Sequence, residues 1–302
     1  MLNVSKSYHY VKNSLCFLFV LISCKQFAQQ ADLFEAQRLC HEKKFDQSIA
    51  IIDKVIVNPE TNGDHSAWYI RSYAYLHYFK QLGLDKYSRT DLIDTAVSSA
   101  LQSIKLDKAA EYKTNNEDLI KSSAASFYKL CTTLLQDSLN SARSEAYYLK
   151  YKKYTALINP DFDFKQKDLE YYNTTGSLFA DMYMKNNFNQ KYGDIAKAAL
   201  LKVLDIDSKN ISANINLGIL YYNQGATLMR MMDYDVDLAE LDVIQENAKK
   251  LFKQSLPFMI KVYELDPKAE KALESLQGIY SALLDEEKAN EFKQKKEALN
   301  KK

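Results

Sequence analysis

The stretch NINLGILYYNQGA (Asn214–Ala226) carries the clearest helix-packing pattern in this chain. Leu217, Gly218 and Tyr221 fall on one face when the stretch is drawn as a helix. A glycine on such a face allows a neighbouring helix to come close. We therefore expect a helix that packs against the next one through this face. The residues left to meet a partner are Ile219, Tyr222 and Asn223.

The composition of the whole chain favours helices. Hydrophobic residues make up 47% of the 302 residues, which is too many for a disordered chain. Seven glycines and four prolines are too few for a many-stranded sheet with tight turns, so we expect an all-α fold. Forty basic residues against 39 acidic ones give no electrostatic basis for binding nucleic acid or an anionic membrane.

The N-terminal segment has the pattern of an export signal. Lys6 and Lys12 precede the apolar run Leu15–Ser23, which is too short to span a bilayer. The letters LISC resemble a bacterial lipobox, in which Cys24 would be lipidated and become the first residue of the mature chain. Cleavage after Ala28 is the alternative. In both cases we expect a protein of the periplasm or outer membrane. Only the lipobox interpretation would attach it to a membrane, through a lipid on Cys24.

Two cysteines with free thiols would remain after export, Cys40 and Cys131, because Cys24 is either lipidated or lost with the signal. An oxidising compartment would allow them to form a disulfide. They are far apart in the sequence, and we expect two small buried side chains instead.

Helix-ending motifs recur along the chain. Each has apolar residues, then Asp or Asn, then Pro or a polar residue, so that one helix stops and the next is capped. Recurrence at roughly fifty residues indicates an array of helical hairpins. We expect residues 1–28 to hold the signal and a short linker, and residues 29–302 to form five to six repeats with a C-terminal capping helix. The equivalent positions are Pro59, Lys108, Pro160, Ser208 and Pro267.

The repeats resemble the tetratricopeptide-repeat (TPR) family, in particular exported proteins of Gram-negative bacteria. In that family the first helix of a repeat carries a large, a small and an aromatic residue in turn, and the second begins with an aromatic and a small residue. The resemblance implies a right-handed α-solenoid of stacked antiparallel helical hairpins. The matching residues are Leu217, Gly218 and Tyr221; Trp68, Ser72 and Tyr75; Gly176 and Phe179; Leu273, Leu276 and Tyr280; Phe45, Ser48 and Ile52; Ala196 and Leu200; and Ala289.

The resemblance also implies a concave groove, lined by residues beside the packing positions. Tyrosine is in excess, with 22 copies, and suits recognition because it offers contact area and one hydrogen bond. The positions that correspond to the groove are Tyr69, Tyr73, His77, Asn173, Ser177, Ile219, Tyr222 and Asn223.

No catalytic or metal-binding motif is present. The four histidines share no ligand spacing, and the glycines are scattered singly, so neither a metal site nor a phosphate loop is expected. We expect no enzyme activity and no cofactor. The predicted function is non-catalytic binding of a protein or peptide in the bacterial cell envelope. The alternative is a glycan-binding lipoprotein for nutrient uptake, which the single tryptophan disfavours.

Overall fold

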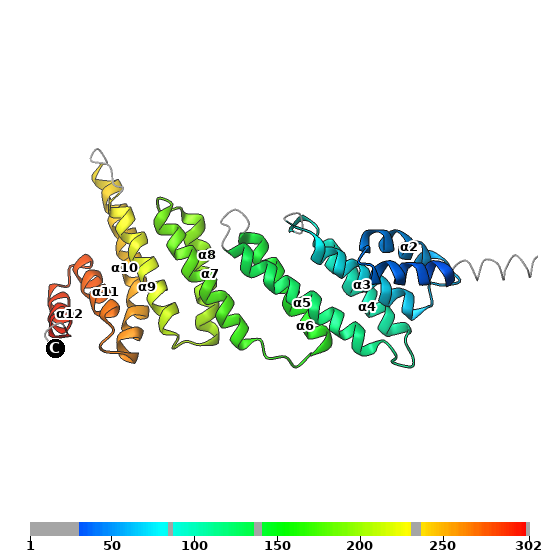
Figure 1. Cartoon of the computed structure of the whole chain (residues 1–302). Coiled ribbons are helices and arrows are strands. Elements are labelled where there is room, and N and C mark those ends of the chain that lie inside the picture. The colour runs from blue at the N-terminus through cyan, green and yellow to red at the C-terminus, as the bar shows by residue number, and fades with distance from the viewer. Residues whose placement is uncertain (1–29, 84–86, 136–140, 231–236, 300–302) are drawn as a thin grey trace, which may run out of the picture. The chain divides into compact units, whose positions relative to one another are not determined.

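The computed structural model describes residues 30–83, 87–135, 141–230 and 237–299, and all its regular elements are helices (Figure 1). Residues 30–41 are helical and precede α2. The further helices are α2 (Phe45–Val57), α3 (His65–Gln81), α4 (Asp91–Leu106), α5 (Lys113–Leu135), α6 (Ser141–Ile158), α7 (Lys165–Lys185), α8 (Gln190–Ile206), α9 (Ile211–Arg230), α10 (Leu238–Leu265), α11 (Glu270–Ala282) and α12 (Glu286–Leu299).

The chain divides into two compact units. Unit 1 is Met1–Phe162 and unit 2 is Asp163–Lys302. No helix in the described ranges is long and apolar enough to cross a membrane.

Unit 1 is a stack of helical hairpins. The helical residues 30–41 pair with α2, α3 pairs with α4, and α5 lies beside α6 (Figure 1). The first helices of successive hairpins also touch, since α3 contacts α5. The core between the first hairpin and α3 includes Ala36, Phe45, Ile52 and Ala74, all buried.

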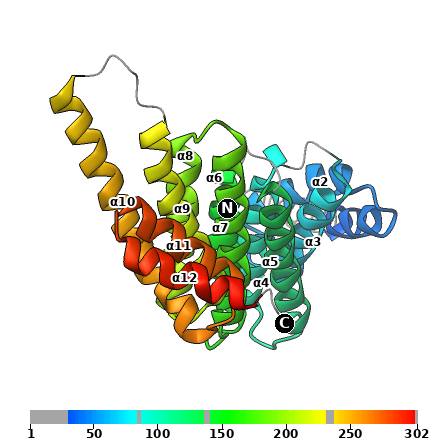
Figure 2. The same cartoon turned by 90° about the vertical axis from the view of Figure 1, so that its left-hand side faces the viewer.

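Unit 2 repeats this arrangement with α7 and α8, α9 and α10, and α11 and α12. Helix α9 contacts both α7 and α11, and α11 and α12 lie side by side (Figure 2). Hairpins that each bury an apolar face against the next hairpin form an α-solenoid. The predicted all-α solenoid of stacked helical hairpins is therefore confirmed within each unit.

The α9–α10 contact confirms the packing predicted for Asn214–Ala226. Leu217 has no exposed surface, and Tyr221 stacks on Phe258 with ring centroids 5.8 Å apart. The Ser255 hydroxyl of α10 donates a hydrogen bond of 2.6 Å to the carbonyl oxygen of Gly218. This short distance between a side chain and the facing backbone requires a close approach of the two helices.

Polar bridges between helices explain part of the tyrosine excess. Asp53 of α2 accepts hydrogen bonds from the Arg71 guanidinium and the Tyr75 hydroxyl of α3, both at 2.7 Å. Burial and the bond to Asp53 raise the pKa of Tyr75 to about 12. Asp94 of α4 binds Lys150 and the Tyr154 hydroxyl of α6 in the same way. A buried hydroxyl needs such a partner, so these tyrosines are part of the packing.

The two cysteines are free and buried, as predicted. The Cys40 sulfur lies 3.1 Å from the Ser48 hydroxyl. Burial raises the pKa of the Cys131 thiol to about 12, so it stays protonated and unreactive at neutral pH.

Candidate functional site

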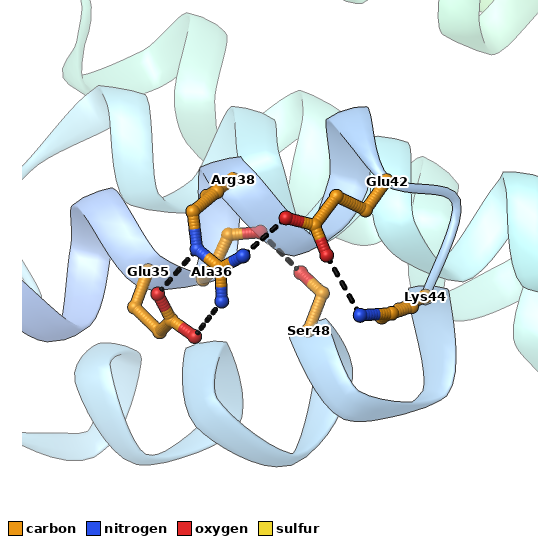
Figure 3. Close-up of polar contacts among 6 residues, drawn as sticks. All are labelled: Glu35, Ala36, Arg38, Glu42, Lys44 and Ser48. Carbon is orange, nitrogen blue, oxygen red and sulfur yellow. Dashed lines mark hydrogen bonds and ion pairs between the residues drawn. The ribbon is translucent and has the colours of Figure 1, made fainter.

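One wall of the candidate site is the helical segment 30–41, which α2 holds in place. The Ser48 hydroxyl of α2 donates a hydrogen bond of 2.8 Å to the carbonyl oxygen of Ala36 (Figure 3). On the exposed side, Arg38 pairs with Glu35 and Glu42, and Glu42 also pairs with a lysine of the following turn. Exposed ion pairs contribute little stability each, so the buried bond to Ala36 is the main polar anchor of this wall.

The floor of the site is an aromatic row on α3. Tyr69, Tyr73 and His77 follow one another at four-residue spacing, which places them on one face. Their ring centroids are 6.4 Å apart for Tyr69 and Tyr73, and 4.1 Å apart for Tyr73 and His77. Burial, with a smaller contribution from Lys80, lowers the pKa of His77 below 6.5, so its ring is neutral at pH 7. The row is therefore aromatic and uncharged.

A pocket of about 680 Å³ opens between segment 30–41 and α3. Phe34 lines it with 63% of its surface exposed, opposite Tyr69 and Tyr73. Tyr112, from the turn before α5, packs against Tyr69 at a centroid distance of 4.8 Å, with the ring planes tilted by 42°. The Asp107 carboxylate accepts the backbone N–H of Tyr112 at 2.7 Å and so fixes this turn. The volume is in the range of pockets that bind ligands.

Two smaller pockets continue this site along α3 and α5. The first, of about 250 Å³, shares Tyr69 and Tyr73 with the large pocket. The second, of about 430 Å³, shares Lys80 and Ser122 with the first. We call the three connected pockets the α3 groove. It runs from the N-terminal to the C-terminal ends of α3 and α5.

Unit 2 has a second candidate surface on α7, α9 and α11. Ile219 and Tyr222 of α9 line a pocket of about 490 Å³ together with residues of α11. On the other side of α9, the Asn216 amide donates a hydrogen bond of 2.8 Å to the Ser177 hydroxyl. The Asn223 amide likewise donates to the Met184 sulfur at 3.0 Å.

The eight predicted groove residues thus fall into two sets. Three lie together in the α3 groove of unit 1. Five belong to unit 2, where Asn173 is half-buried on α7 and its Oδ1 has no hydrogen-bond partner in the part of the chain that the structure describes. Contact with a ligand stays a prediction for all eight. Cys24 and the export segment lie outside the described residues.

Sequence reasoning missed several residues of the α3 groove. Lys80 follows His77 by three residues and so continues the same helical stripe, which its spacing could have shown. Tyr112 and Phe34 carried no such signal, because each comes from a different part of the sequence and meets Tyr69 only in the folded unit.

The side chains of the described residues meet the needs of a binding site better than those of a metal site. No three of their His, Cys, Asp or Glu side chains come together in a way that could hold a metal ion. The groove provides aromatic faces, amides, hydroxyls and a few charged side chains, which are groups that can contact a ligand.

Comparison with known proteins gives only distant structural likeness. No protein-family model matches the sequence, and no curated protein matches it. The structure of a monomeric IFIT1 mutant with Gppp-AAAA aligns with 89% of this chain at 16% identity and a TM-score of 0.36, and the chain spans half of that protein. Nro1, described as a hypoxic regulator of sterol synthesis and a nuclear import adaptor, aligns over 90% of this chain and 86% of its own, at 14% identity and a TM-score of 0.34. The fold assignment therefore rests on the helices and their contacts.

Proposed function

We propose that this protein is a non-catalytic binding scaffold of the TPR type, which binds a protein through a peptide segment. The observation that carries the proposal is the α3 groove, in which three neighbouring first helices place an aromatic row beside open volume. Tyrosine rings in such a row bind a peptide by area and hydrogen bonding at low entropic cost.

The proposed place of action is the bacterial cell envelope. Its support is the sequence alone: the apolar run Leu15–Ser23 follows two lysines and precedes Cys24. The near balance of 40 basic and 39 acidic residues also favours a protein partner over nucleic acid.

Crosslinking in the native cells tests the binding function. A photoreactive phenylalanine derivative replaces Tyr73 in the α3 groove or Tyr222 on the unit 2 surface. We expect a discrete crosslinked product, identified by mass spectrometry, because both side chains line a pocket. Matched controls carry the same derivative at Ser98 of α4 and Ala198 of α8, which are exposed on second helices.

Crosslinks of equal yield at the groove and control positions would contradict the proposal, as would none at either groove position. Saturable binding on a glycan array without any protein crosslink would favour the glycan-binding alternative instead.

Replacement of Cys24 by alanine tests the anchor. If Cys24 is lipidated, the Cys24→Ala protein should move from the membrane fraction to the soluble periplasmic fraction, because a lipid chain is its only proposed attachment. Immunoblots of the fractions measure this, and Cys40→Ala is the control. Membrane association that persists without Cys24 would refute the lipid anchor.

A further inference from the structure

The two ends of the α3 groove carry opposite charges. The large pocket at the N-terminal end of α3 is lined by Glu60 and Asp64, and by no lysine or arginine within the described ranges. The pocket at the other end is lined by Lys80 and Lys129, and by no acid among those same residues.

These charges are without ion-pair partners in the described part of the chain. Among the described residues, Glu60 is exposed and pairs with no cation. The Asp64 carboxylate accepts hydrogen bonds there only from Ser66, from its backbone N–H at 2.8 Å and its hydroxyl at 2.7 Å. Lys80 donates to the neutral Ser122 hydroxyl at 2.6 Å, and Lys129 is exposed and forms no ion pair with a carboxylate in the described ranges. In contrast, Asp118 in the middle pocket is paired with Lys121 at 3.1 Å.

The middle of the groove is mainly aromatic, and its one acid, Asp118, is paired with Lys121. Tyr69 and Tyr73 line both the large and the middle pocket, and the ring of His77 is uncharged at pH 7. Tyr69 and Tyr112 also offer ring faces beside the acids, where a cation is attracted to an aromatic ring as well as to a carboxylate.

The length of the groove sets the size of its occupant. From Asp64 to Lys80 the chain advances 16 helical residues, or about 24 Å at 1.5 Å per residue. An extended peptide covers that distance in about seven residues, at roughly 3.3 Å per residue.

We propose that the α3 groove binds an extended peptide with a basic side chain at one end and an acidic side chain about seven residues away. The Lys or Arg of the peptide lies between Glu60, Asp64 and the Tyr69–Tyr112 pair. Its Asp or Glu lies between Lys80 and Lys129, and apolar or aromatic side chains in between contact Tyr73. Electrostatic complementarity of this kind selects the partner and its register. This inference rests on the proposed peptide-binding function and adds the chemistry of the peptide.

Selection from a phage library of random nine-residue peptides on the immobilised full-length protein tests it. We expect peptides with a basic and an acidic residue separated by five to seven positions to be enriched about tenfold over the input library. The Tyr73→Ala variant should lose the enrichment. Because Phe34 is 63% exposed, Phe34→Ala should weaken it without affecting folding, which circular dichroism checks.

Reversal of one charge at the Lys80–Lys129 end gives the specific readout. Lys129→Glu should remove the selection for an acidic residue, because the new carboxylate offsets the charge of Lys80 in the same pocket. Lys105→Glu, which reverses an exposed lysine on α4, should leave the selected sequences unchanged.

The possible failures are distinguishable. Enriched peptides that depend on Tyr73 but lack opposite charges would overturn the charge inference and leave peptide binding intact. A Lys129→Glu selection identical to that of the wild type would overturn it as well. No enrichment above the Tyr73→Ala background would refute both the inference and the proposed function of this groove.

Discussion

Replacement of Gly225 by leucine should destabilise unit 2 by about 3 kcal/mol, a cost at the upper end of that for overpacking a tight contact. A Cβ at this position would lie 2.8 Å from the Phe252 ring and 3.1 Å from the backbone carbonyl oxygen of Ala248 on α10. The carbonyl belongs to a helix and has no room to move. Leucine is a better helix former than glycine by roughly 0.8 kcal/mol, so helix propensity alone predicts that the substitution stabilises the protein.

Urea denaturation followed by far-ultraviolet circular dichroism measures this loss, and hydrogen exchange of α9 and α10 locates it. Gln254→Leu is the control, since it places the same side chain on an exposed position of α10 and should change the free energy of unfolding by less than about 0.5 kcal/mol. A Gly225→Leu protein as stable as the wild type would show that α9 and α10 are not in tight contact there.

Truncation of Phe127 to alanine should cost unit 1 about 3 to 5 kcal/mol, the range for removing a fully buried aromatic ring. Phe127 has no exposed surface on α5, and its ring centroid lies 5.5 Å from Tyr147 and 5.7 Å from Tyr154 of α6. The Lys150 ammonium sits 4.9 Å from the same ring. The cavity would therefore open between α5 and α6, the two helices of one hairpin.

Fluorescence of Trp68 reports this change, because it is the only tryptophan in the sequence and lies in unit 1. The urea midpoint of the fluorescence transition should be lower in Phe127→Ala than in the wild type. The decrease should be smaller in Phe127→Leu, because leucine leaves a smaller cavity. The exposed Thr132→Ala change on the same helix serves as the control. An unchanged midpoint in Phe127→Ala would contradict the packing described for α5 and α6.

Part of the groove was predictable because it depends on the spacing within one helix. Tyr69, Tyr73 and His77 recur every four residues, so any helix over this stretch places them on one face. The packing face of α9 was predictable for the same reason. By itself, then, the sequence determined the helical class, the hairpin array and the stripes that each helix presents.

The tertiary structure alone decided which of those stripes became a binding groove. Phe34 and Tyr112 come from segments before and after α3, and Lys129 comes from the C-terminal part of α5. Whether these side chains lie in the same groove as the aromatic row depends on how segment 30–41, α3 and α5 pack together. Side-chain spacing within a single helix does not specify that packing. The division into two units was likewise decided by the tertiary structure, because it depends on contacts between segments that are distant in the sequence. Periodicity is a local property of a chain, whereas exposure and charge pairing are set by whatever neighbour covers each side chain.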